Sequence, residues 1–284
     1  MNKIYKSEES KQVVLNKYQE ILDSWPVEND QYKINTVYGE TFVIESGSKE
    51  KPPLVLIHGS VANSFCWIGD VEKLSKTHNV YAIDIIGEAG YSEENRPKYE
   101  SGDYPKWINN VFEELGLKSA SMVGLSLGGW MSLSFAVKYP GKVDNLVLLC
   151  PGGLHSEKSS FLWKAIFLSL FGKWGSNQIT KIINGDKLPD ANDVGLKSAL
   201  EFTALISKNF NPRMDKLPIY TGSELKNLIM PTLVLYGDTD HMLSADASID
   251  HIKKHARNVK TILLPNTGHV IANQTERILE FING

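Results

Sequence analysis

Short apolar runs alternate with helix-length amphipathic segments along most of this 284-residue chain. The runs are residues 53–57, 80–86, 121–125, 146–149, 232–236 and 260–264. A run that is apolar throughout, rather than at every second position, is typical of a parallel strand covered on both faces by helices. The pattern predicts an α/β protein with a doubly wound, mostly parallel sheet, in which ligands bind beyond the carboxyl ends of the strands.

The N-terminal part adds a helix and a hairpin to this pattern. Apolar residues spaced by three and four predict an amphipathic helix over residues 7–25, and they are Val14, Tyr18, Ile21, Leu22 and Trp25. Residues 32–38 and 40–46 are rich in β-branched and aromatic side chains and are joined by Gly39, which predicts an antiparallel hairpin.

The long interval before the last two apolar runs breaks the alternation. Its helix-like segments are separated by Gly, Pro and Asn residues, and we recognise no strand pattern in it, so we interpret it as a helical cap inserted after the sixth strand. Three of its aromatic residues, Phe161, Trp163 and Phe167, are candidates for a substrate pocket, although aromatic residues more often serve packing. The chain is thus divided into an N-terminal helical extension, a core and a cap: residues 1–30, residues 31–153 with 231–284, and residues 154–230.

The pentapeptide Gly-Leu-Ser-Leu-Gly at residues 124–128 ends one of the apolar runs and precedes a helix-like segment. This is the strand–turn–helix setting of the G-x-S-x-G motif, in which glycines allow the close backbone approach that a sharp turn needs. Ser126 is therefore the predicted nucleophile. The backbone N–H of Leu127, at the start of the helix, is a predicted donor to a developing oxyanion.

A serine hydroxyl needs a base, and the base needs an acid that fixes its tautomer. His269 follows the last apolar run, and both Asp238 and Asp240 follow the run before it. The chain order of serine, acid and histidine agrees with that of the α/β-hydrolases. We favour Asp240, because its position further from the strand end leaves room to turn toward His269, and Asp238 stays the alternative.

The loop after the first parallel run reads His58-Gly59-Ser60. We assign the backbone N–H of Ser60 as the second oxyanion donor, with Gly59 shaping the loop. His58 is interpreted as a brace for this loop rather than as a proton-transfer group.

With these motifs, the chain resembles the α/β-hydrolase superfamily over residues 37–281, specifically the capped carboxylesterase-like branch with a His-Gly oxyanion loop. The resemblance implies an acyl-enzyme formed on Ser126, assisted by His269 and Asp240, without a cofactor. Ser60 and Leu127 match the oxyanion residues of the family.

The chain departs from the family pattern in two loops. The loop at residues 84–92 is one residue longer than the usual Asp-x-x-Gly-x-Gly-x-Ser, and it flanks the expected site. His58-Gly59-Ser60 replaces a triple-glycine loop, which disfavours the lipase-like subgroup that handles bulky tertiary-alcohol esters. A serine nucleophile also disfavours the haloalkane dehalogenases and epoxide hydrolases, which use an aspartate.

These residues favour a serine hydrolase for a small or medium, largely apolar carboxylic ester. The chain has four arginines and only Arg213 falls in the cap range, which leaves little provision for a strongly anionic substrate. Two alternatives remain open: a carbon–carbon bond hydrolase or perhydrolase on the same triad, and a ligand-binding regulatory protein that keeps the hydrolase fold.

Composition excludes several other classes. The net charge of −3 is spread without basic blocks, so no nucleic-acid partner is expected. The chain shows neither a secretion signal nor an apolar run of membrane-spanning length, which indicates a cytoplasmic protein without a membrane partner. We expect it to be monomeric or homodimeric.

Cys66 and Cys150 form no disulfide framework and are expected to be buried thiols. Asp240 next to His241 is weak evidence for a metal, and none is expected.

Overall fold

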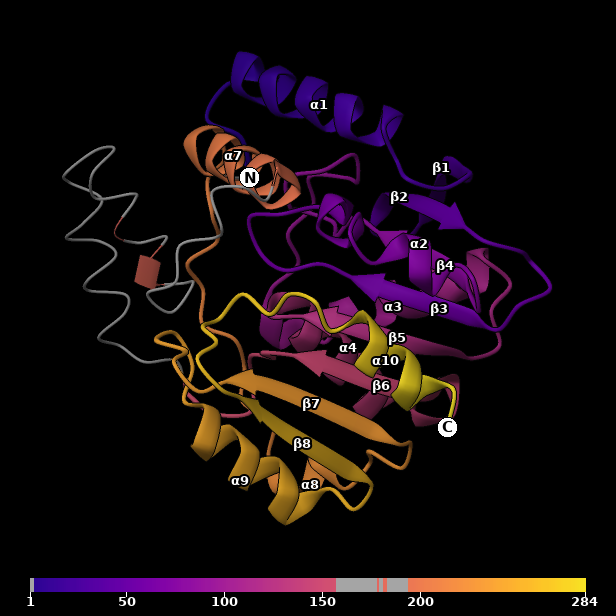
Figure 1. The fold of residues 1–284 in the computed structure, drawn as a ribbon, viewed down its shortest axis with the longest axis vertical. Coiled ribbons are helices and arrows are strands. Elements are labelled where there is room, and N and C mark those ends of the chain that lie inside the picture. Colours follow the sequence, from indigo (N-terminus) through magenta and orange to yellow (C-terminus); the bar gives the residue numbers. More distant parts are fainter. Residues whose placement is uncertain (1–2, 157–177, 179–180, 183–193) are drawn as a thin grey trace.

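The computed structural model describes residues 3–156, 178, 181–182 and 194–284. They form an eight-stranded sheet in the order β1-β2-β4-β3-β5-β6-β7-β8 (Figure 1). β1 and β2 form an antiparallel hairpin, β2 runs antiparallel to β4, and the remaining neighbours are parallel. The prediction of a mostly parallel α/β sheet with an antiparallel hairpin is confirmed. The strands are β1 (Asn29–Thr36), β2 (Gly39–Ser46), β3 (Pro53–Ile57), β4 (Asn79–Ile83), β5 (Ala120–Leu125), β6 (Val143–Leu149), β7 (Thr232–Gly237) and β8 (Val259–Leu264).

Helices flank this sheet. Helix α3 packs against α4, which in turn contacts β3, β5 and β6, while α10 contacts α2 and α8 contacts α9. No described helix is both long and apolar enough to cross a membrane. The described helices are α1 (Glu8–Asp23), α2 (Val71–Leu74), α3 (Asp103–Glu114), α4 (Leu127–Lys138), α7 (Val194–Asn209), α8 (Gly222–Leu225), α9 (Ala245–His255) and α10 (Thr275–Ile282), with 3-10 turns η1 (Ser64–Trp67), η2 (Tyr99–Ser101) and η3 (Pro140–Lys142).

Strand β4 ends earlier than the apolar run at residues 80–86 suggested. Its last residue is Ile83, and the prediction that the strand continues to residue 86 is wrong. The chain leaves the sheet because Asp84 is fully buried and accepts hydrogen bonds from both the backbone N–H and the hydroxyl of Ser64. The N–H of Ile85 then donates to His58 instead of to a strand. Apolar residues beyond the strand end thus line a buried loop.

The N-terminal helix α1 begins at Ser7, whose side chain caps the N–H of Ser10. The predicted buried face is present, and α1 packs against α7 (Figure 1). Tyr18 stacks on Phe202 of α7 at a centroid distance of 6.1 Å, and its hydroxyl donates to Asp84 at 3.0 Å. The extension is therefore joined both to the end of the long interval and to the loop that follows β4.

Helices α7 and α8 fall within residues 154–230, the range interpreted as a cap. Phe161, Trp163 and Phe167, the candidates for the substrate pocket, lie outside the described residues. The cap and the three-part division of the chain stay predictions.

Candidate active site

Ser126 occupies the turn between β5 and α4 and is half-buried. Its φ of 52° lies in the left-handed region, which a residue with a side chain adopts only when its surroundings hold it there. The N–H of Ser126 donates to the carbonyl of Leu149 at 2.8 Å, which anchors the turn to β6. A Cβ added to Gly124 would lie 2.4 Å from the carbonyl oxygen of Gly128, so the turn requires glycine there.

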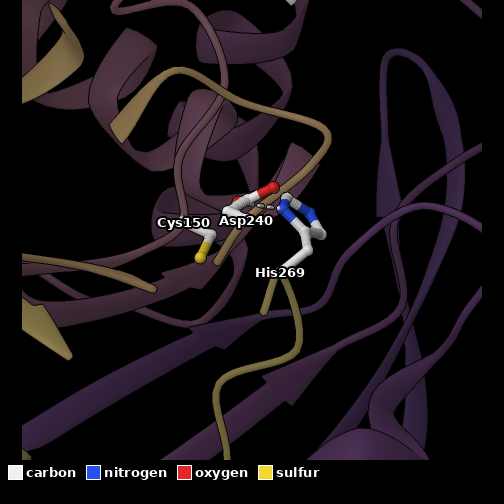
Figure 2. Close-up of side chains that lie close together, drawn as sticks. All are labelled: Cys150, Asp240 and His269. Atoms are coloured by element: carbon white, nitrogen blue, oxygen red, sulfur yellow. Dashed lines mark hydrogen bonds and ion pairs between the residues drawn. The ribbon is translucent and has the colours of Figure 1, made fainter. Parts of the chain in front are cut away.

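The structure brings Ser126, His269 and Asp240 together. The Nε2 atom of His269 lies 2.9 Å from the Oγ of Ser126, and its Nδ1 lies 2.8 Å from the Oδ2 of Asp240. Asp240 and His269 are buried, and Figure 2 shows the imidazole turned toward the carboxylate. The three residues come from the loops that follow β5, β7 and β8, as the order of the runs predicted.

Electrostatics favour a charged Asp240. Burial by itself raises the pKa of this carboxyl, but hydrogen bonds from His269 and from the N–H groups of Leu243 and Met242 outweigh it and hold the pKa below its ordinary value. Burial by itself lowers the pKa of His269, and its interactions with Asp240 and Cys150 together more than offset this, so the pKa of the imidazole is raised. The pair thus stabilises a positive charge on the ring.

The alternative acid, Asp238, does not contact His269. It is exposed, and its Oδ1 accepts a hydrogen bond from the N–H of Thr267 at 3.1 Å. Its own N–H continues the ladder to the carbonyl of Leu264. Asp238 therefore braces the loop that carries His269, and Asp240 is the carboxylate that reaches the ring.

Both predicted oxyanion donors belong to segments next to Ser126. A Cβ on Gly59 would lie 3.5 Å from the Cβ of Ser126, so the loop that continues to Ser60 passes next to the nucleophile. Leu127 is the first residue of α4, where N–H groups lack helical acceptors. Within the described residues, neither the N–H of Ser60 nor that of Leu127 has a hydrogen-bond acceptor. Both are free to donate to a reacting group.

His58 is fully buried and braces this loop, as interpreted from the sequence. Its Nδ1 lies 2.7 Å from the carbonyl oxygen of Gly59, and its Nε2 accepts from the N–H of Ile85 at 2.9 Å. Both ring nitrogens are engaged with backbone, which leaves none for proton transfer.

Cys150 is a component of the site that the sequence reasoning missed. It follows β6 with a φ of 44° and is buried against the pair of Asp240 and His269 (Figure 2). These three side chains are the described group whose spacing could hold a metal, with ligand atoms within 4.8 Å of one another. Since both imidazole nitrogens already contact Ser126 and Asp240, the arrangement favours proton transfer over metal binding. Its position directly after a strand was the available signal.

The expectation that both cysteines are buried thiols is correct for Cys150 and wrong for Cys66, which is partly exposed. Cys66 lies on the short turn η1, at the rim of the loop after β3 rather than in the sheet. Both thiols are free.

Glu88 is the second component that the sequence reasoning did not single out. It is 3% exposed, and its Oε2 accepts a hydrogen bond from the N–H of Val61 at 2.8 Å, with the hydroxyl of Ser60 at 3.5 Å. Burial raises the pKa of Glu88 to about 7, although the Val61 bond and the charge of Arg96 act in the other direction. The signal was its place in the loop that departs from the family pattern.

Arg213, the arginine considered for substrate binding, is already engaged. Its guanidinium bonds to Asp215, to the carbonyl of Pro97 and to the hydroxyl of Tyr104, and it stacks over Tyr99 at 3.8 Å. These contacts tie the segment after α7 to the core.

The sheet, the serine on its strand–helix turn, and an acid and a histidine that follow later strands define an α/β-hydrolase. Residues 52–194 match the family model described as the alpha/beta hydrolase fold, and the chain belongs to this family.

The chain is similar to two proteins of Bacillus subtilis strain 168 along most of their length. It is 29% identical over 277 residues to an uncharacterized carboxylesterase, nap, covering 94% of this chain and 91% of the relative. It is 26% identical over 275 residues to the carboxylesterase YbfK, covering 94% and 92%.

Solved structures from the same organism agree with this similarity. The structure of naproxen esterase (carboxylesterase NP) matches with a TM-score of 0.83 at 28% identity, covering 98% of this chain and 100% of that one. The structure of carboxylesterase CesB (YbfK) matches with a TM-score of 0.83 at 26% identity, covering 97% and 99%. The likeness therefore extends over whole chains.

Replacing Gly128 tests the packing of the nucleophile turn. A Cβ there would lie 2.2 Å from the carbonyl oxygen of Ile57, which cannot move without distorting β3. Gly128→Ala should reduce the free energy of unfolding by roughly 3 kcal/mol or more. Urea unfolding measures this, with Gly141→Ala as control, because a Cβ at Gly141 meets nothing within 4 Å. Equal stability of the two variants would contradict the close approach.

Glu88 predicts a dependence of stability on pH. Its pKa is about 7 in the folded chain against 4.5 ordinarily, so the folded state binds a proton more tightly and loses stability as pH rises from about 5 to 8. Glu88→Gln does not titrate, and its free energy of unfolding relative to wild type should rise by roughly 2 kcal/mol over that range.

Glu45→Gln is the matched control for this experiment. Glu45 is also buried, but hydrogen bonds from Asn79 and Tyr32 oppose its burial and lower its pKa. Its substitution should therefore change stability by the same amount at pH 5 and pH 8. A difference between Glu88→Gln and wild type that does not vary with pH would refute the buried, proton-binding carboxyl.

Proposed function

We propose that this protein is a serine carboxylesterase that cleaves small or medium, largely apolar carboxylic esters through an acyl-enzyme on Ser126. The observation that carries the proposal is the chain of two hydrogen bonds, 2.9 Å from Ser126 to His269 and 2.8 Å from His269 to Asp240. The similarity to carboxylesterases over whole chains supports the ester as the bond that is cleaved.

In the first half of the reaction, His269 takes the proton of the Ser126 hydroxyl as the oxygen attacks the ester carbonyl. The positive charge on the ring is stabilised by Asp240. Collapse of the tetrahedral intermediate expels the alcohol, which receives its proton from His269. In the second half, His269 takes a proton from a water, which attacks the acyl-enzyme. The bond to the Ser126 oxygen then breaks, His269 returns the proton to that oxygen, and the acid is released.

The negative oxygen of each tetrahedral intermediate would be bound by the N–H groups of Ser60 and Leu127. Their positions beside Ser126, and their lack of an acceptor among the described residues, support this role. The N–H of Leu127 gains further from the dipole of α4.

Two observations bear on the size and polarity of the substrate. Arg213 is engaged within the protein, which agrees with an uncharged acyl group. One similar structure is that of naproxen esterase, so naproxen esters join simple esters as first substrates to test. Three expectations stay predictions. They are the pocket roles of Phe161, Trp163 and Phe167, the cytoplasmic location, and the monomeric or homodimeric state.

Ser126→Ala tests the nucleophile. The variant keeps the fold but removes the attacking oxygen, so hydrolysis of p-nitrophenyl esters should fall by about 10⁴-fold or more. Wild type should release a burst of p-nitrophenol equal to the enzyme concentration, and the variant should not. Rates that do not differ would rule out Ser126. If wild type is labelled by a fluorophosphonate but turns over no ester, a carbon–carbon bond hydrolase or perhydrolase becomes the better assignment.

Asp240→Asn and Asp238→Asn decide between the two acids. The amide at 240 leaves the size unchanged but no longer stabilises a charged His269, so kcat should fall by about 10³–10⁴-fold. Among the described residues, the Asp238 carboxylate accepts a hydrogen bond from the backbone N–H of Thr267 and none from His269, so its variant should keep kcat within a few-fold of wild type. Steady-state kinetics with one ester measures both. The reverse order of effects would exclude Asp240.

A further inference from the structure

We propose that Glu88 is a positioning residue that holds the loop at residues 59–61 in the geometry in which the Ser60 N–H faces the reacting carbonyl. The inference rests on the proposed function, in which this N–H binds the oxyanion. Nothing in the triad contacts Glu88, so its contribution is separable from that of Ser126, His269 and Asp240.

The loop needs such a hold because Val61 is strained. It has a φ of 56°, and a β-branched residue is strongly disfavoured in this left-handed region. A strained residue persists only when surrounding contacts over-determine it. The N–H of Val61 is bonded to the Oε2 of Glu88 at 2.8 Å, which fixes the peptide that joins Ser60 to Val61. Loss of this acceptor frees the loop to relax.

A second hydrogen bond between the same two loops holds the other end of the turn. The side chain of Asn63 donates to the carbonyl of Ala89 at 2.7 Å, so consecutive residues 88 and 89 hold both ends of the strained turn. The loop that carries them is one residue longer than the family pattern. The added length accompanies a carboxylate that reaches the oxyanion loop from outside the triad.

An acid at this position is unfavourable for folding, because burial raises the pKa of Glu88. The charges of Arg96 and Arg213 lower the pKa of Glu88, and the charge of Glu88 in turn raises the pKa values of Tyr5, Tyr99 and Tyr104. The arginines bond to Gly87, Asn211 and Pro97 carbonyls rather than to Glu88. Glu88 forms no salt bridge within the described part of the chain, yet it bonds to the loop at residues 59–61. A buried carboxyl with a raised pKa in this place indicates a functional role.

The test uses Glu88→Ala, Glu88→Asp and Glu88→Gln in the full chain. Glutamine keeps an oxygen that accepts from Val61, aspartate is one methylene too short to reach it, and alanine removes the acceptor. We expect kcat on a p-nitrophenyl ester to fall about 10- to 100-fold in Glu88→Ala, less than the loss of a whole oxyanion donor. Glu88→Asp should be intermediate and Glu88→Gln within about 3-fold of wild type, with KM changed less than about 2-fold throughout, because the oxyanion forms only after binding.

A merely structural role is excluded by two further measurements. Glu45→Ala, at another buried glutamate, should lower the melting temperature without changing kcat. A trifluoromethyl ketone that forms a tetrahedral adduct should lose affinity for each Glu88 variant by the same factor as kcat/KM. Where Glu88→Ala does not fold, the comparison of aspartate with glutamine decides.

The proposal is overturned if folded Glu88→Ala or Glu88→Asp retains the kcat of wild type, if Glu88→Gln is as impaired as Glu88→Asp, or if only KM changes. Failure of the proposed function is a different result: wild type would then hydrolyse no ester. In that case the rate at which a fluorophosphonate labels Ser126 replaces kcat, because its phosphoryl oxygen uses the same N–H donors. The same order of variants is expected there.

Discussion

The close approach of β3, β5 and α4 at Ser126 is the constraint on which the rest of the site depends. Helix α4 begins directly over the end of β3, so near that the carbonyl of Ile57 occupies the place of a side chain at Gly128. This packing puts the first N–H groups of the helix and the hydroxyl of Ser126 at the carboxyl edge of the sheet. The left-handed backbone of Ser126 is held there by the carbonyl of Leu149. Backbone contacts of the three parallel strands β3, β5 and β6 thus fix the position of Ser126.

The histidine and its acid reach the serine through backbone packing of the same kind. A Cβ on Gly237 would lie 2.1 Å from the carbonyl of Thr267, so the loops after β7 and β8 are in direct contact. Asp238 adds a bond across the same junction. The distance between Asp240 and His269 is therefore set by how these two loops meet, and the side chains need little freedom of their own.

Much of this could be predicted from the sequence, because parallel strands bring the residues that follow them to one edge. Ser126, Asp240 and His269 each follow a recognisable apolar run, and so does the Ser60 loop. The preference for Asp240 over Asp238 rested on reach, and the structure adds a second reason, because Asp238 accepts a hydrogen bond from Thr267. The end of β4 was missed because Ile85 and its neighbour remain buried after the strand ends.

The contact between Glu88 and Val61 could not be predicted, since it joins two loops whose pairing depends on the order of strands β3 and β4 in the sheet. The position of Cys150 after β6 places it at the same edge of the sheet, but that position alone does not predict its contact with His269. Its closeness to His269 follows only from the junction of β6 with the loops after β7 and β8. Sequence periodicity identifies which residues follow strands, and the contacts between loops are a property of the assembled sheet.

The two buried carboxyls Asp240 and Glu88 differ in the direction of their pKa shifts because of the donors around them. Asp240 accepts from two backbone N–H groups and an imidazole, and these outweigh its burial. Glu88 accepts one short hydrogen bond from an N–H group, and the Ser60 hydroxyl lies further away, at 3.5 Å. The effect of burial therefore exceeds that of these hydrogen bonds, and the pKa of Glu88 rises. Environment therefore separates a carboxyl with a lowered pKa, next to His269, from a carboxyl whose pKa is raised to about 7. In the proposed reaction, Asp240 would stabilise the positive charge on His269, and Glu88 would hold the loop that binds the negative oxygen.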